Sequence, residues 1–71
     1  REVDFLVTNN GKPWFAVEVK ASAKEIARNL TYFGDRLNIP FLYQIVDERN
    51  IDIRKDKIRI LSMEKFLSAL V

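Results

Sequence analysis

The sequence contains no cysteine and no histidine among its 71 residues. Disulfides, cysteine-based zinc sites, cysteine nucleophiles and histidine-based catalysis are therefore excluded. Any metal ion bound by these side chains must be held by oxygen ligands. Such ligands suit the hard cations magnesium, manganese and calcium.

The sequence also lacks an apolar run long enough to cross a bilayer and a strong excess of either charge. Its net charge of +2 is compatible with nucleic-acid contact without indicating it. Hydrophobic residues make up 48% and charged residues 31%, a balance typical of a folded globular protein. We expect a cytoplasmic protein with no membrane contact. Because a strand-like pattern begins directly at Arg1, we expect residues 1–71 to be a single domain from a larger protein.

Two segments near the start alternate between apolar and polar residues, as β-strands do. In residues 2–8 the odd positions 3, 5 and 7 are apolar, and in residues 14–20 the odd positions 15, 17 and 19 are apolar. The turn-forming run Asn9-Asn10-Gly11 lies between them. We predict a hairpin.

The register of this hairpin follows from parity, because a slip of one residue turns an apolar face to water. Matching the apolar faces pairs odd positions with odd positions. A two-residue loop at Asn10-Gly11 pairs Asn9 with Lys12, odd with even, and is disfavoured. A three-residue loop over residues 9–11 with Gly11 left-handed satisfies parity, as does a five-residue loop.

Residues 22–25 have the sequence of a helix capping box, in which Ser22 caps and Glu25 reaches back. We predict a helix over residues 23–37 that ends at Asn38. Gly34 is expected to weaken its second half by about 1 kcal/mol relative to alanine. The apolar residues at helical spacing are Ile26, Leu30, Phe33 and Leu37.

The rest of the chain predicts three strands and a helix. Residues 41–46 form an apolar strand of buried character, expected to pair in parallel with the strand at 14–20. Residues 51–54 and 58–61 predict two short strands, and residues 64–70 a closing amphipathic helix. The fold class is therefore α/β, with a small mixed sheet flanked by helices.

Three charged residues share one face of the predicted hairpin. Either favoured loop places Asp4, Glu18 and Lys20 together. Two carboxylates on adjacent strands repel each other, and a divalent cation removes that conflict. Asp4 and Glu18 would supply oxygens to Mg²⁺ or Mn²⁺, which leave room for water and phosphate. Lys20 would position or deprotonate a water, or stabilise charge on the phosphate.

This arrangement resembles the PD-(D/E)XK nuclease superfamily, in which an acidic residue on one strand is followed by Glu-X-Lys on the next. More narrowly, EVDFLV at residues 2–7 and AVEVKAS at residues 16–22 look like the uncharacterised C-terminal domain found behind the ATPase module of many microbial ATPases. The resemblance implies a restriction-endonuclease-like core, here lacking its first helix. It also implies an upstream ATPase module in the same chain.

Carried onto this sequence, the resemblance makes Asp4, Glu18 and Lys20 the catalytic residues. Asp4, Glu18 and the backbone carbonyl of Val19 would hold Mg²⁺ or Mn²⁺, with Gln44 as an accessory polar residue. Glu2 is a weaker candidate on the same face. Val3 stands where the name-giving proline would be, and the helix that often brings another glutamate is absent.

Two functions remain open. The first is a nuclease-related domain that binds a divalent metal, with DNA as a candidate partner and phosphodiester hydrolysis if the site is complete. The second is a non-catalytic interaction domain that regulates or oligomerises the ATPase. Because the missing helix should leave apolar surface uncovered, we expect a homodimer. Glu18 and Lys20 could also be a solvated strand face, and the basic cluster Arg54, Lys55, Lys57 and Arg59 a charged turn.

Overall fold

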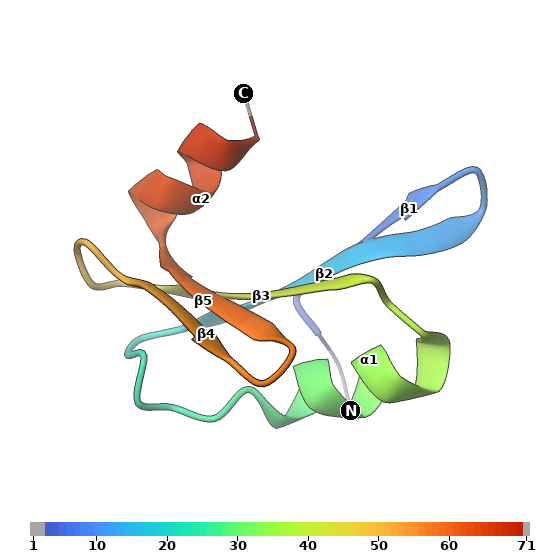
Figure 1. The fold of residues 1–71 in the computed structure, drawn as a ribbon, viewed down its shortest axis with the longest axis horizontal. Helices are drawn as coiled ribbons and strands as arrows, with labels where there is room; N and C mark the ends of the chain where they lie inside the picture. The colour runs from blue at the N-terminus through green and yellow to red at the C-terminus, as the bar shows by residue number, and fades with distance from the viewer. Residues whose placement is uncertain (1–2, 71) are drawn as a thin grey trace.

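The computed structural model describes residues 3–70 as a five-stranded mixed sheet with one helix on each face (Figure 1). This confirms the predicted α/β class. None of the helices described is long and apolar enough to span a membrane. In chain order the elements are β1 (Phe5–Asn9), β2 (Lys12–Lys20), α1 (Arg28–Leu37), β3 (Phe41–Val46), β4 (Asp52–Lys55), β5 (Ile58–Ser62) and α2 (Met63–Ala69).

The strand order across the sheet is β1-β2-β3-β5-β4. The three central strands β2, β3 and β5 are parallel, whereas the edge strands β1 and β4 are antiparallel to their neighbours. The predicted parallel pairing of the second and third strands is confirmed. Its register places Glu18 beside Gln44.

The hairpin of β1 and β2 satisfies parity in a way that the sequence did not indicate. Val7 pairs with Phe15, odd with odd as predicted, but Thr8 pairs with Pro13. Trp14 is therefore an extra residue on β2, a β-bulge that shifts the register by one. The bulge permits the two-residue turn that parity alone had disfavoured, so the predicted loop length was wrong.

That turn consists of Asn10 and Gly11, with φ angles of 54° and 77°. Positive φ at both central positions is what a type I′ turn requires, and its twist matches the strands it joins. Asparagine tolerates this conformation better than most residues, and glycine adopts it at no steric cost. The Asn-Gly pair thus selected the short loop, and the bulge restored the apolar register.

Each face of the sheet has its own apolar core. On the α1 side, Ala16 and Leu42 pack with Leu30 of the helix. On the α2 side, Val17, Ile45 and Leu61 form the buried cluster, against which Phe15, Tyr43 and Phe66 pack. Because successive residues of a strand point to opposite faces, β2 and β3 contribute to both cores.

Helix α1 begins at Arg28, five residues after the predicted start. The capping-box contacts nevertheless form. The Glu25 carboxylate accepts the Ser22 backbone N–H at 3.0 Å, and the Ser22 hydroxyl oxygen accepts the Lys24 N–H at 3.1 Å. They close a single turn that does not continue as a helix. As a result Ile26, predicted to be on the buried helix face, is 61% exposed.

Other boundaries lie closer to the prediction. The helix ends at Asn38, whose φ of 52° makes it a left-handed cap with its N–H bonded to the Gly34 carbonyl. Strands β4 and β5 and helix α2 lie within one residue of their predicted bounds. Phe41 departs from the buried character expected for β3, since it is 51% exposed.

Gly34 is needed for packing, which its helix propensity does not reveal. A Cβ built at this position would lie 2.6 Å from Cδ1 and 3.2 Å from Cδ2 of Leu42. Leu42 is itself only 5% exposed, so it has little room to move. The glycine therefore lets α1 lie close against β3.

We predict that Gly34→Ala lowers the free energy of unfolding by about 1–2 kcal/mol. Overpacking costs ~1–3 kcal/mol and outweighs the ~1 kcal/mol gain in helix propensity. Urea denaturation monitored by circular dichroism measures the change. Thr31→Ala, at an exposed position of the same helix, is the control and should be neutral or slightly stabilising. Recovery of stability in Gly34→Ala/Leu42→Val would identify the clash, whereas a stabilised Gly34→Ala would contradict it.

Candidate functional site

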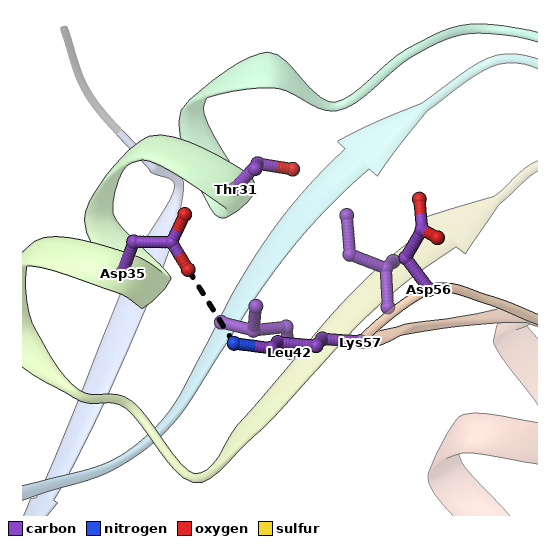
Figure 2. A pocket seen from close by; sticks show the side chains of 6 residues that line it. Thr31, Asp35, Leu42, Asp56 and Lys57 are labelled. Carbon is purple, nitrogen blue, oxygen red and sulfur yellow. Dashed lines mark ion pairs between the residues drawn. The ribbon is translucent and has the colours of Figure 1, made fainter.

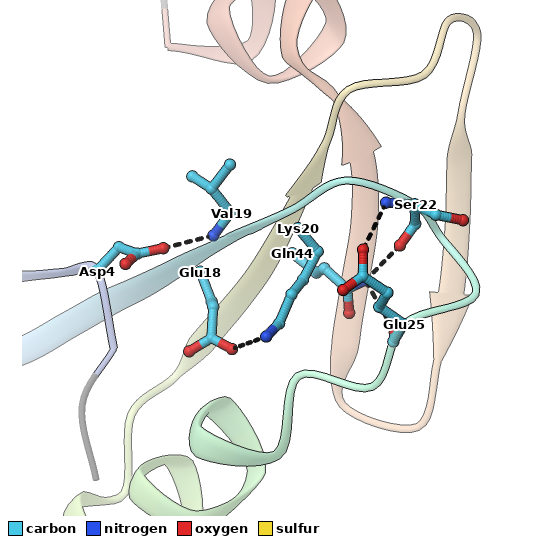
Figure 3. Close-up of polar contacts among 7 residues, drawn as sticks. All are labelled: Asp4, Glu18, Val19, Lys20, Ser22, Glu25 and Gln44. Atoms are coloured by element: carbon cyan, nitrogen blue, oxygen red, sulfur yellow. Dashed lines mark hydrogen bonds and ion pairs between the residues drawn. The ribbon is translucent and has the colours of Figure 1, made fainter.

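Glu18 and Lys20 project from β2 toward the α1 side of the sheet (Figure 3). Glu18 is only 5% exposed, although it carries a carboxylate. Its Oε2 lies 3.3 Å from the Lys20 Nζ, which is partly open to solvent. Burying an ionised group is costly unless it is paired, so this ammonium compensates the Glu18 charge. The sequence prediction that both residues share a face is thus met by a direct ion pair.

Asp4 lies just before β1 and contacts the same stretch of β2. Its Oδ2 accepts a hydrogen bond of 2.7 Å from the backbone N–H of Val19. Figure 3 shows the carboxylate directed at the β2 backbone, while the Glu18 side chain extends toward α1. The structure therefore places the Asp4 carboxylate beside the Val19 backbone, between Glu18 and Lys20 in sequence. The predicted common face holds for Glu18 and Lys20 but is wrong for Asp4, because this residue lies before β1 and its carboxylate accepts a backbone N–H. Glu2, the weaker candidate, lies outside the described residues.

The Val19 backbone faces the Asp4 side of β2. In an extended strand the N–H and C=O of one residue project to the same side. Since the Val19 N–H meets Asp4, its carbonyl points to the same edge. An ionised carboxylate has about four lone-pair sites, so Asp4 retains acceptor capacity beyond this one bond.

These residues supply oxygen donors only, which is the ligand chemistry that a hard cation prefers. The donors are the carboxylates of Asp4 and Glu18 and the Val19 carbonyl, all oxygen ligands of the type that magnesium takes together with water and phosphate. Within residues 3–70 no group of three or more acidic, histidine or cysteine side chains is placed to hold a metal ion. A cation here would therefore depend on the backbone carbonyl and on non-protein ligands.

No family model, curated protein or solved structure matches this chain.

Gln44 borders the candidate site and holds the segment that leads from β2 to α1. It is 1% exposed and lies beside Glu18 in the register of the parallel strands. Its Nε2 donates to the carbonyls of Ser22 at 3.3 Å and Glu25 at 3.1 Å. In a continuing helix the Glu25 carbonyl would accept the N–H of residue 29, and here it accepts the Gln44 amide instead. This explains why the capped turn does not extend into α1.

Glu48 is a second residue that holds the same segment, and no pattern in the sequence indicates it. Its Oε1 accepts the backbone N–H of Ala23 at 2.6 Å. The two residues are 25 positions apart, so no local pattern reveals the contact. For Gln44 a signal existed, since a single amide stands in the otherwise apolar run of β3.

A separate hollow of about 310 Å³ lies between α1 and the β4–β5 turn (Figure 2). Asp35 and Lys57 meet across it at 3.7 Å, and both side chains are largely exposed. Exposed pairs of this kind contribute ~0–1 kcal/mol. We therefore read the hollow as a solvated surface feature.

Among residues 3–70, two of the four basic residues in the cluster Arg54, Lys55, Lys57 and Arg59 form ion pairs, Lys57 with Asp35 and Arg59 with Asp52. Arg59 donates two hydrogen bonds to the Asp52 carboxylate, at 3.1 and 3.0 Å. This contact lowers the pKa of Asp52. At the start of α2, the pKa of Glu64 is lowered by its own backbone N–H and by that of Asn50. These contacts stabilise the β4–β5 hairpin and the start of α2, which lie away from the strand that carries Glu18.

We predict that Gln44→Met lowers the free energy of unfolding by about 1–3 kcal/mol. The near-isosteric side chain leaves the Glu25 carbonyl without its donor and removes one of the two hydrogen bonds that the Ser22 carbonyl accepts. A partly buried group that loses its hydrogen bond costs about this much. Hydrogen exchange should accelerate at the amides of residues 22–25, and not in β5. Uniformly faster exchange throughout the sheet would show that Gln44 acts on the whole fold instead. Lys55→Met, on exposed β4, is the control.

Proposed function

We propose that this chain is a nuclease-related domain of the PD-(D/E)XK type that binds a divalent metal ion, Mg²⁺ or Mn²⁺. The supporting observation is the convergence of Asp4, Glu18 and Lys20 on one stretch of β2, with the Asp4 carboxylate 2.7 Å from the Val19 nitrogen. A cytoplasmic location, DNA as partner and an upstream ATPase module are parts of the same proposal.

In this proposal Asp4, Glu18 and the Val19 carbonyl hold the cation. A divalent cation supplies a Lewis acid for a phosphate oxygen and lowers the pKa of a bound water. Lys20 has a second role, because its ammonium already lies beside Glu18 and is partly open to solvent. It would orient a water or stabilise negative charge on a phosphodiester. Cleavage would follow only if substrate phosphate completes the ligand set.

The second candidate is a non-catalytic interaction domain that regulates or oligomerises an ATPase. It is favoured by the contacts that Asp4 and Glu18 already make with Val19 and Lys20. Each carboxylate has a partner without any metal ion, so both could serve the fold alone. Metal titration separates the two candidates.

We predict that calorimetric titration of Mn²⁺ into the protein shows saturable binding that is lost in both Asp4→Asn and Glu18→Gln. Each substitution keeps the side-chain shape and removes one anionic ligand. Asp47→Asn, an exposed carboxylate just after β3, is the matched control and should bind as the unaltered chain does. Absence of binding to the unaltered chain would reject the metal site and leave the interaction domain.

We further predict that Lys20→Met binds Mn²⁺ several-fold more tightly than the unaltered chain. The ammonium competes with a cation for Glu18 and repels it, so its removal favours the ion. Without metal, the same variant should be less stable, because Glu18 loses its partner. Lys24→Met, an exposed lysine outside the strand, controls for net charge. Weaker binding in Lys20→Met would contradict the placement of the cation at Glu18.

A further inference from the structure

The α2 side of the sheet has an open apolar groove. It has a volume of about 280 Å³, and the residues within 3–70 that line it are all apolar and come from β1, β2, β3, α2 and the C-cap of α2. Figure 1 shows α2 over one part of the sheet, while the β1–β2 hairpin extends beyond it, where no helix formed by residues 3–70 covers that face. Phe5 and Val19, which line the groove, are 61% and 46% exposed. The volume is just under the ~300–1,000 Å³ usual for small-molecule pockets.

Helix α2 presents apolar surface beside this groove. Met63, Phe66, Leu67 and Leu70 recur at the spacing of one helix face. Phe66 packs on Tyr43, with ring centroids 5.4 Å apart. Leu67 and Leu70 remain 53% and 58% exposed. One molecule therefore carries both an apolar groove and, next to it, a helix with uncovered leucines.

A groove and a helix of this kind on one chain are self-complementary. If two copies meet about a two-fold axis, the helix of each enters the groove of the other, and both contacts are made at once. We propose that two copies of this chain associate in this way, face to face through α2 and the apolar groove.

The area on this face is adequate for such a dimer. Phe5, Val19, Met63, Leu67 and Leu70 are each 44–61% exposed. At ~150 Å² for a fully exposed side chain, their apolar surface amounts to on the order of 400 Å². A standard interface takes ~800 Å² from each partner, of which somewhat more than half is apolar. Within residues 3–70 no charged side chain lines the groove, and the net charge of +2 opposes association only weakly. The apolar content of the face thus matches what a stable dimer needs.

The dimer does not depend on the proposed metal site. Glu18 and Lys20 point to the α1 side, whereas the groove lies on the opposite face. Glu18→Gln should therefore abolish metal binding and leave the dimer intact. Failure of one proposal does not entail failure of the other.

Sedimentation equilibrium of the 71-residue chain tests the dimer. We expect a concentration-dependent dimer for the unaltered chain and at least a tenfold larger dissociation constant for Phe5→Lys and for Leu67→Glu. In a two-fold dimer each substitution places a charge in both contacts. Phe5→Lys places it in the groove, and Leu67→Glu places it on the helix. Ile26→Glu is the matched control, because Ile26 is as exposed as Phe5, at 61%, and lies outside the groove.

A mixing experiment tests the exchange of helices itself. A heterodimer of Phe5→Lys with Leu67→Glu has two different contacts. In one, the unaltered helix of Phe5→Lys enters the unaltered groove of Leu67→Glu. In the other, the helix that carries the new glutamate enters the groove that carries the new lysine. The mixture should therefore associate at least tenfold more tightly than either variant alone. Circular dichroism verifies that each variant is folded, and Val19→Lys replaces Phe5→Lys if the latter is not.

Three results would overturn the proposal. The first is that the unaltered chain is a monomer at all concentrations. This result overturns the proposal even if the monomer binds an apolar dye, because the groove would then bind something other than a second copy. The second is a dimer that survives in both single variants. The third is a mixture that shows no recovery.

Discussion

The parallel pairing of β2 with β3 is the constraint on which the rest of the structure depends. Parallel neighbours need a crossover connection, and residues 21–40 supply it with α1 packed on one face of the sheet. Both strands lie inside the sheet, so each must present apolar residues on both faces. The α1-side and α2-side cores therefore share two strands. The same pairing sets Gln44 beside Glu18, which determines both the loop after β2 and the surroundings of the candidate site.

Local pattern predicted most of the sheet because the strands obey a period of two. The apolar odd positions of β1 and β2 fixed the register of the strand bodies, and the buried run of β3 fixed its bounds. The turn escaped prediction because two devices act together. Asn10-Gly11 favours a two-residue loop that conflicts with parity, and the bulge at Trp14 removes the conflict. The two-residue turn and the bulge can be predicted only together, because each one alone conflicts with the apolar pattern of the strands.

The start of α1 was missed for a different reason, which is tertiary. The capping box at Ser22 and Glu25 is correct as local chemistry, and its bonds form. Gln44, distant in sequence, then takes the Glu25 carbonyl that a continuing helix would use. Glu48, also distant, accepts the Ala23 N–H, a first-turn donor that has no partner within a helix. Ala27, 2% exposed, packs into the core as the cap of the true helix. Long-range polar contacts thus override a sound local signal.

For the candidate site, the sequence supplied the residue types and the shared face of Glu18 and Lys20, since strand alternation determines both. It could not supply the burial of Glu18, the ion pair, or the bond from Val19 to Asp4. Asp4 lies outside the ladder of β1, where alternation no longer fixes a side chain. Its carboxylate turns to the backbone, because the Val19 N–H at the uncovered edge needs an acceptor.

Alternation along β2 also explains how one strand can serve two faces without interference. Glu18 and Lys20 are directed to the α1 side, and the Val19 side chain between them lines the apolar groove. The Val19 peptide meanwhile lies in the plane of the sheet, beside Asp4. A side-chain change at Val19 therefore alters the groove while preserving the backbone group that faces Asp4. The pleat of one strand thus separates the proposed metal site from the proposed dimer contact, so either one can be disrupted by mutation while the other is measured.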